Sequence, residues 1–448
     1  MAKAHSDLPS QLPERPVSRW VEPFARFLRV EAAGGAVLVA ATALALVLAN
    51  SPLADAYLAI WQTKLTIGFG DFVLSHSLKH WISDALMAVF FFVIGLEVKR
   101  ELVMGELREL SKAALPIAAA LGGMVVPAGI YLALLWGEPA ARGWGIPMAT
   151  DIAFVVGCMA VLGSRVPPGL RVLLISLAIA DDIGAILVIA IGYTESIALG
   201  WLGVGVAAIG VVYLMQQADV RSVPLYALVG AVVWLGFHES GVHATIAGVI
   251  LGVMTPHKRW VGFRRLEEVV DRSAVYLRGE SETSKGDQQI LLRDMELAAR
   301  EATSPLERLE TLLHPWQAFA IVPLFALANA GVTLSPDALD EPVALAVAIA
   351  LAAGKPVGIF GASWLAVKLG LARLPEGVSW GAVLGGAALA GIGFTMSLFI
   401  GGLAFRGLDP VLTEAAKFGI LIGSLASAVL GMGLLLRILP KAPPSPRA

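Results

Sequence analysis

The stretch Leu177-Ala178-Ile179-Ala180-Asp181-Asp182-Ile183-Gly184-Ala185 decides the fold class, because it places two acids in the middle of an apolar run at about 171–193. A helix that spans a bilayer needs about 20 mostly apolar residues, since unpaired backbone groups in hydrocarbon are costly. An ionised side chain in mid-membrane costs about 2.5 kcal/mol or more, so an acid that persists there indicates a functional site. The stretch therefore predicts a membrane-spanning helix that binds a cation.

The composition of the whole chain agrees with a membrane protein. Of its 448 residues, 57% are hydrophobic and only 15% are charged, against roughly 25% charged in a soluble domain. So few charges exclude a soluble enzyme, a disordered chain and a nucleic-acid-binding protein. The 33 basic and 35 acidic residues give no net field that would attract nucleic acid, and one cysteine, Cys158, permits no internal disulfide.

Long continuous apolar runs favour an all-α polytopic membrane protein over a β-barrel. Between charged or turn-rich breaks lie twelve predicted spans, at about 32–50, 80–98, 113–136, 144–163, 171–193, 198–216, 223–237, 241–255, 315–333, 342–367, 380–405 and 411–436. We interpret the first run as a retained span and not as a signal peptide. The seventh and eighth runs are short, so a re-entrant pair is an alternative for them.

The basic residues predict the orientation of these spans. With the N-terminus inside, 27 of the 33 Lys and Arg residues fall in cytoplasmic segments and only 4 in outside segments, which places both termini in the cytoplasm. The predicted organisation is an N-terminal tail at 1–29, helices 1–8 at 30–256, a charged cytoplasmic loop at 257–313, helices 9–12 at 314–438 and a C-terminal tail at 439–448. The loop is interpreted as a solvated connection, with a regulatory or partner-docking role as the alternative.

Four charged residues remain at similar depth inside the predicted spans. Asp181 and Asp182 lie in the fifth span, Asp151 follows Thr150 in the fourth, and Lys355 stands halfway along the tenth. Carboxylate oxygens are hard ligands suited to Na⁺, Li⁺ or H⁺. Successive helical residues point about 100° apart, so we expect one aspartate to bind the ion and the other to pair with Lys355. A salt bridge between Asp181 and Lys355 that only fixes helix packing is the alternative.

Two of the predicted spans are interrupted at their centres. Thr150 and Asp151, close after Pro147, interrupt the fourth span, and Gly391-Ile392-Gly393-Phe394-Thr395 interrupts the eleventh. Such centres unwind easily and expose helix ends whose partial charges can face an ion. Interruptions in corresponding positions of two halves predict a transporter with inverted-topology repeats. Close helix packing through Gly391 and Gly393 is the alternative.

Other titratable groups lie nearer the membrane surfaces. Glu97 and Glu101 are four residues apart on one helical face, and we expect Arg100 to bridge them, so that their titration responds to pH. A solvated helix end is the alternative. Asp84 lies near the opposite end of the same span, and His243 opens the eighth, where it either reports outside pH or is a hydrogen-bonded structural residue.

The chain outside its tails and the 257–313 segment resembles the NhaA-type sodium/proton antiporters. The resemblance rests on seven motifs, namely Asp84–Phe91, Gly95–Leu102, Ala149–Phe154, Asp181-Asp182, His314-Pro315-Trp316, Gly354-Lys355-Pro356 and Gly391–Ser397. It implies twelve helices in a bacterial inner membrane, with broken fourth and eleventh helices that cross near the paired aspartates. It also implies a small outside hairpin at a homodimer contact, within 51–79, to which the 57–73 portion is assigned.

The same resemblance implies an activity and a set of roles. Asp181 and Asp182 would bind Na⁺ or Li⁺ in competition with protons, Lys355 would balance charge, and Thr150 and Asp151 would stabilise the facing helix ends. Exchange would be electrogenic, by alternating access, and activated at alkaline pH through the positions that are Glu97, Glu101, His243 and Glu310 here. We expect no cofactor and no enzymatic activity. In this chain Glu307 and Thr311 replace a lysine and a histidine of the family, which affects the expected pH set-point.

Two other functions use similar residues. A sodium-coupled solute symporter would need a larger polar pocket than the predicted spans offer. An intramembrane aspartyl protease needs two membrane aspartates, and Gly68-Phe69-Gly70-Asp71 matches a Gly-x-Gly-Asp signature. This Asp71 falls in a polar outside loop, however, and the sequence has no Tyr-Asp partner motif.

Overall fold

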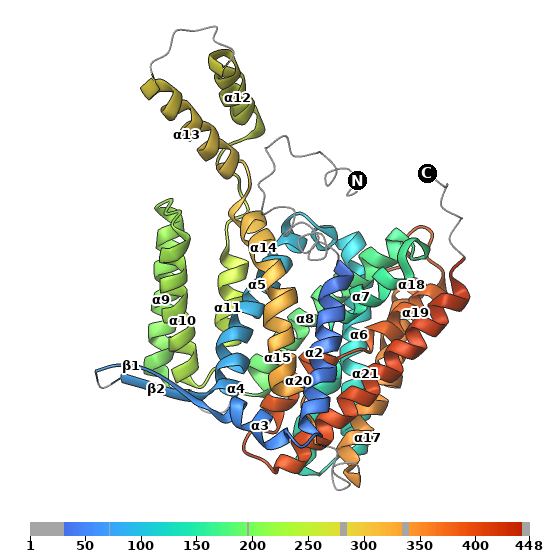
Figure 1. Ribbon diagram of the computed structural model, residues 1–448. Helices are drawn as coiled ribbons and strands as arrows, with labels where there is room; N and C mark the ends of the chain where they lie inside the picture. The colour runs from blue at the N-terminus through green and yellow to red at the C-terminus, as the bar shows by residue number, and fades with distance from the viewer. Residues whose placement is uncertain (1–30, 71, 195–196, 278–284, 334–339, 441–448) are drawn as a thin grey trace.

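The computed structural model is a bundle of long helices that stand roughly side by side (Figure 1). It describes residues 31–70, 72–194, 197–277, 285–333 and 340–440. The predicted N-terminal tail, Asp71 of the protease-like motif and the last eight residues of the predicted C-terminal tail lie outside the described residues.

The first part of the chain runs from α2 to α11. Its elements are α2 (Glu31–Ala49), α3 (Ala54–Gln62), β1 (Lys64–Phe69), β2 (Phe72–Ser77), α4 (Leu78–Trp81), η1 (Ile82–Leu86), α5 (Met87–Val103), η2 (Glu106–Arg108), α6 (Leu110–Leu134), η3 (Pro139–Met148), α7 (Ile152–Leu162), η4 (Gly163–Arg165), α8 (Pro168–Gly192), α9 (Leu199–Gln217), α10 (Val223–Ser240) and α11 (Thr245–Met254).

The second part contains α12 (Phe263–Leu277), α13 (Lys285–Glu301), α14 (Pro305–Trp316), η5 (Gln317–Ile321), α15 (Val322–Asn329), α17 (Pro342–Ile349), η6 (Ala350–Gly354), α18 (Lys355–Lys368), α19 (Trp380–Ala390), α20 (Phe394–Ala404) and α21 (Pro410–Ile438). The predominantly helical membrane fold is confirmed. Each of the twelve predicted runs falls on one or more of these helices.

The number of full spans is nine to eleven in the described ranges. Nine helical segments are long and apolar enough to cross a bilayer, and the bent pairs α2–α3 and α19–α20 raise the number to eleven. The eighth predicted span corresponds to α11, which has 10 residues and is too short by itself for hydrocarbon about 30 Å thick. The expected twelve therefore depends on counting this short helix.

Helices of the bundle pack in pairs. α6 lies along α18, α5 along α11, and α17 and α19 along α21, while α9 and α10 form a pair at one side (Figure 1). Small residues permit close approach: a Cβ atom on Gly95 of α5 would lie 2.6 Å from the carbonyl oxygen of Val249 in α11. Lipid tails are as apolar as the helix surfaces, so close packing of this kind, and not the hydrophobic effect, drives helix association in the membrane.

A β-hairpin interrupts the otherwise helical chain after α3. β1 and β2 are antiparallel, with Phe69 opposite Phe72, and the hydroxyl groups of Thr66 and Ser75 are 2.8 Å apart. The hairpin thus runs from Lys64 to Ser77, and its assignment to 57–73 is wrong by seven residues at the start and four at the end. Residues 57–62 belong to α3, because the buried Tyr57 packs into the bundle and its hydroxyl donates to the carbonyl of Leu327.

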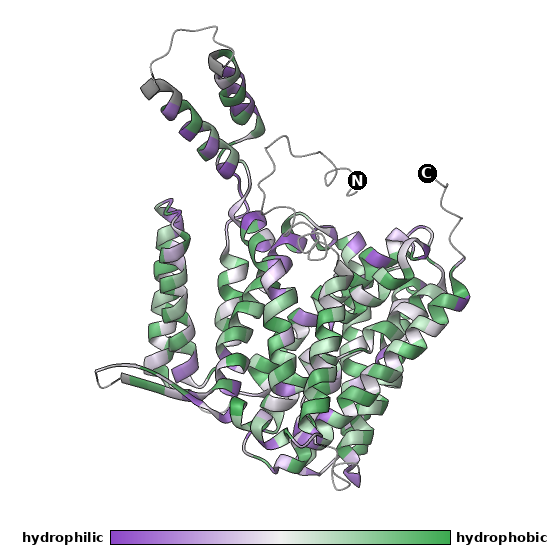
Figure 2. Ribbon diagram, in the orientation of Figure 1, coloured by the Kyte–Doolittle hydropathy of each residue, from purple (hydrophilic) through white to green (hydrophobic). Residues whose placement is uncertain are grey.

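The charged segment after α11 forms two helices of its own. α12 and α13 project from one end of the bundle, opposite the β-hairpin (Figure 1), and hydrophilic residues are frequent there (Figure 2). The following helix begins at Pro305, earlier than the span predicted from about 315. A capping box starts it: the Ser304 side chain accepts from the Glu307 amide, and the Glu307 carboxylate accepts from the Ser304 amide.

Candidate ion-binding site

Two interrupted helices meet in the centre of the bundle. An extended segment, 149–151, separates η3 from α7, and α19 and α20 enclose a bend of 46° at 391–393. The Asp151 amide donates to the Ile392 carbonyl at 2.7 Å, and the Thr150 hydroxyl donates to the Ala390 carbonyl at 2.9 Å. Each break thus supplies hydrogen-bond partners for the other, and these bonds pair the buried Asp151 amide and the carbonyl groups of Ala390 and Ile392.

The carboxylate of Asp151 caps two helices at once. Oδ1 accepts from the Phe154 amide at 3.3 Å in the first turn of α7. Oδ2 accepts from the amide of Thr395 at 3.0 Å and from its hydroxyl at 2.5 Å, in the first turn of α20. A negative charge is favourable at the positive end of a helix dipole. One buried acid therefore neutralises the N-terminal ends of both half-helices.

The glycines of the second break permit this close crossing. A Cβ atom on Gly391 would lie 2.6 Å from the Leu351 carbonyl oxygen and from the Ser427 hydroxyl, and one on Gly393 would lie 3.0 Å from the Ala149 carbonyl oxygen. Both distances are shorter than a normal carbon–oxygen contact. The predicted packing role and the predicted break of the helix therefore occur together at these residues.

Lys355 reaches the crossing from a widened helical turn. Its neighbour Pro356 has no amide hydrogen and cannot continue the regular α-helical ladder, and the preceding residues 350–354 form a π-helical turn, a distortion that is frequent at functional sites. The ammonium group donates to Oδ2 of Asp181 at 2.5 Å and to the Thr150 hydroxyl. Lys355 of α18 thus contacts α8 through Asp181 and the first break through Thr150.

Asp181 and Asp182 lie side by side on α8 in different surroundings. Their exposed fractions are 1% and 3%, and that of Lys355 is 0%. In the part of the chain that the structure describes, Oδ1 of Asp181 and Oδ1 of Asp182 have no hydrogen-bond partner. Because buried polar atoms are normally paired, these two oxygens are available to a proton or to a small hard cation.

The residues predicted to regulate pH response lie at two ends of the bundle. Near the α14 end, Arg100 forms an ion pair with Glu310, and its Nη2 atom is 3.9 Å from Oε1 of Glu101. Arg100 thus pairs with Glu101 and also ties α5 to α14 through Glu310, while its expected contact with Glu97 stays a prediction. His243 lies far from these acids in the chain's fold, beside the hairpin end, where its Nε2 atom is 3.0 Å from the Tyr193 carbonyl oxygen.

Asp84 lies apart from the paired aspartates. It contacts two histidines, His80 and His238, at the hairpin end of the bundle. The sequence interpretation missed these histidines, although His80 and Asp84 have helical i, i+4 spacing. It also missed the role of Thr395 as a partner of Asp151, because the Gly391–Thr395 motif was interpreted through its glycines.

Comparison with known proteins places the chain in a family. The family model for Na⁺/H⁺ antiporter 1 matches residues 25–435. The "Na(+)/H(+) antiporter NhaA" of Rhodopirellula baltica is 55% identical over 437 residues, covering 98% of this chain and 99% of the relative. That of Rhizobium meliloti is 51% identical over 373 residues, covering 83% of this chain and 85% of the relative. Among solved structures, the sodium proton antiporter MjNhaP1 from Methanocaldococcus jannaschii matches with a TM-score of 0.45 at 14% identity, covering 95% of each chain.

The extent and identity of the sequence matches confirm the resemblance that the motifs indicated. The relatives are named as antiporters, which are transporters. This chain belongs to the Na⁺/H⁺ antiporter 1 family.

Proposed function

We propose that the protein exchanges Na⁺ or Li⁺ for H⁺ across the membrane by alternating access. The observation that carries the proposal is the pair of buried carboxylate oxygens, Oδ1 of Asp181 and Oδ1 of Asp182, without hydrogen-bond partners at the crossing of two broken helices. Intramembrane acids are costly and indicate ion pathways, and the named relatives are Na⁺/H⁺ antiporters.

Competition between ions for the same oxygens provides the coupling. In the state open to the side from which sodium is exported, Asp182 binds the cation together with Asp181. Protons occupy the same carboxylates while the site returns to that side. Two carboxylates can carry two protons against one Na⁺, which makes the exchange electrogenic. Lys355 balances charge while the site is empty, because its ammonium group is bonded to Asp181. Asp151 keeps the helix ends aligned through both states.

The experiment is exchange in proteoliposomes with an imposed pH gradient. We expect sodium to dissipate the gradient for the wild-type protein and for Asp55→Asn, which removes an exposed acid from α3, but not for Asp182→Asn. Unchanged exchange by Asp182→Asn would contradict the proposal. If sodium dissipated the gradient only with an added organic solute, the symporter would replace it.

Activation at alkaline pH is assigned to the acids at the α14 end, Glu97, Glu101 and Glu310, and to His243 at the hairpin end. Glu310→Gln removes a negative charge that favours protonation of the neighbouring acids, and it frees Arg100 to pair with them. Both changes favour the deprotonated, active form at lower pH. We therefore expect the pH of half-maximal exchange to move to lower values, while Glu296→Gln on the exposed face of α13 leaves it unchanged. A shift to higher pH, or the same profile in both variants, would contradict this assignment.

The orientation and assembly complete the proposal. The protein lies in the bacterial inner membrane with α12, α13 and both termini in the cytoplasm, in accord with the distribution of Lys and Arg. The free edges of β1 and β2 pair with those of a second copy, as exposed strand edges readily do. Replacing the exposed Ile67 and Val73 by lysine should convert a dimer to a monomer in light scattering, and an unchanged mass would exclude the hairpin as the contact.

A further inference from the structure

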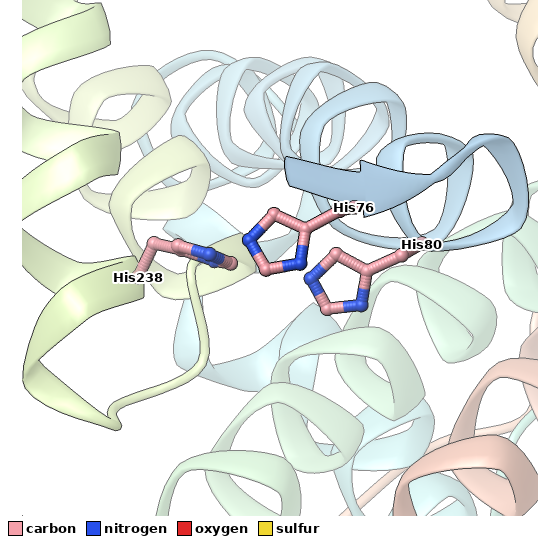
Figure 3. Close-up of side chains that lie close together, drawn as sticks. All are labelled: His76, His80 and His238. Carbon is pink, nitrogen blue, oxygen red and sulfur yellow. The ribbon is translucent and has the colours of Figure 1, made fainter. Parts of the chain in front are cut away.

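Three histidines from separate elements converge at the hairpin end of the bundle. His76 is in β2, His80 in α4 and His238 in α10, and one ring nitrogen of each lies within 4.8 Å of those of the other two. Figure 3 shows the rings of His76 and His80 side by side, with the ring of His238 facing them from α10. Their ring centroids are 4.3 Å apart for His76 and His80, and 5.6 Å apart for His80 and His238.

Asp84 adds an oxygen to this cluster. Its Oδ2 atom is 3.2 Å from Nε2 of His80 and 3.4 Å from Nδ1 of His238. Zinc–nitrogen and zinc–oxygen bonds of about 2.0–2.1 Å in a tetrahedral site separate neighbouring ligand atoms by roughly 3.3–3.4 Å. The two distances to Asp84 therefore already match edges of such a site. The ligand atoms of the three histidines lie within 4.8 Å of one another, so a bound ion would draw them closer together.

The surroundings suit a divalent transition-metal ion. The cluster lines a cavity of about 390 Å³, to which Glu239 contributes a second acid and Arg406 one base. Nε2 of His80 is buried and, although it lies 3.2 Å from Oδ2 of Asp84, it forms no hydrogen bond within the described ranges. Imidazole nitrogens favour zinc and similar transition metals over Na⁺, Mg²⁺ or Ca²⁺.

We propose that His76, His80, His238 and Asp84 form a second cation site, distinct from the transport site, that binds one Zn²⁺ or a similar transition-metal ion per chain. The three imidazoles supply nitrogen ligands and the Asp84 carboxylate supplies the fourth. The site is independent of exchange at Asp181 and Asp182, because no member of it contacts those residues among the contacts described.

Metal binding would fasten together two parts of the fold that already touch through the stacked rings of Trp81 in α4 and Trp234 in α10. His76 and His80 belong to the hairpin and the turn that leads into α5, whereas His238 belongs to α10, which packs mainly on α9. A bound ion therefore cross-links the α9–α10 pair to the hairpin. We expect Zn²⁺ to raise the thermal unfolding temperature of the protein.

The test uses the full chain, purified without a histidine tag, and Zn²⁺ alone as the probe. Competition with a chromophoric chelator measures affinity and stoichiometry, and thermal unfolding with and without Zn²⁺ measures the cross-link. We expect one saturable site. His76→Gln and His238→Gln should each weaken it by about tenfold or more and abolish the thermal shift. His257→Gln, which removes a histidine outside the cluster, and Asp182→Asn should leave it intact.

A folding defect is distinguished by sodium-induced proton release, which the histidine variants should retain. Binding that is unchanged in His76→Gln and His238→Gln would overturn the proposal. So would the absence of saturable Zn²⁺ binding at micromolar concentrations, or its loss in Asp182→Asn.

Discussion

Asp181 and Asp182 are adjacent in the chain and both almost fully buried, yet their partners differ. Side chains of successive helical residues point about 100° apart, so only Asp181 lies against Lys355, at 2.5 Å. Among the ion pairs of the described residues, none joins Asp182 to a basic residue. The difference supports the proposal that Asp181 and Lys355 balance each other's charge and that a proton or a cation neutralises Asp182.

Replacing Lys355 tests how much the ion pair with Asp181 contributes to the stability of the fold. Lys355→Ala leaves a buried carboxylate without its partner, so we expect a loss of about 3–5 kcal/mol in stability, seen as a lower thermal unfolding temperature in detergent. The double variant Lys355→Ala with Asp181→Asn should recover most of the loss, because no unpaired charge remains. Equal destabilisation by the single and the double variant would show that the ion pair does not hold the helices together.

Sequence reasoning reached the charged residues of the site but not all of their partners. The cost of charge in lipid singles out Asp151, Asp181, Asp182 and Lys355 without any structure. Thr395 is uncharged and common in apolar helices, so only its place beside Asp151 identifies it. The three-histidine cluster was equally hidden, because His238 is far in sequence from His76 and His80.

At the scale of elements, the two broken helices depend on each other. The N-terminal ends of α7 and α20 share the carboxylate of Asp151, and the C-terminal carbonyl of α19 at Ala390 accepts from Thr150. Glycine, proline and threonine at mid-span predict that these helices break. That the two breaks touch requires long-range packing, which periodicity and composition do not encode.

Alanine at the second break should disturb the crossing. In Gly391→Ala the new methyl group would meet the Leu351 carbonyl and the Ser427 hydroxyl at 2.6 Å, and overpacking of this kind costs about 1–3 kcal/mol. We expect a lower unfolding temperature and a slower exchange rate in proteoliposomes. Gly402→Ala is the matched control in α20, since nothing lies within 4 Å of its Cβ position. Equal effects of the two substitutions would exclude the close crossing as the cause.

At the scale of the whole molecule, α12 and α13 form an appendage on the ion-exchanging bundle. The Val261 amide donates to the Glu301 carbonyl at 3.2 Å, so the two ends of the appendage meet. Glu301 also pairs with Arg221 at 2.8 Å, which fixes its base to the loop between α9 and α10. Charge counting predicted a polar segment here, but helical pairing and the early start of α14 follow from local contacts and the capping box.

Removing the appendage tests whether it only connects α11 to α14 or also regulates exchange. A variant with residues 264–297 replaced by a short Gly-Ser linker keeps Glu301 and its ion pair, and the adjacent ends allow the chain to close. Because no residue of the removed segment contacts the paired aspartates in the described structure, we expect unchanged exchange rates and an unchanged pH profile in proteoliposomes. A shifted profile would instead assign the segment a regulatory role.

The most direct measurement of ion competition is proton release from the purified protein in weakly buffered detergent solution when Na⁺ is added. No gradient, second solute or vesicle is involved, so the signal reports binding alone. We expect saturable release from the wild-type protein and from Asp55→Asn, and none from Asp182→Asn. Sodium-induced release that persists in Asp182→Asn, or its absence from the wild-type protein at every pH, would contradict competition of Na⁺ and H⁺ at this site.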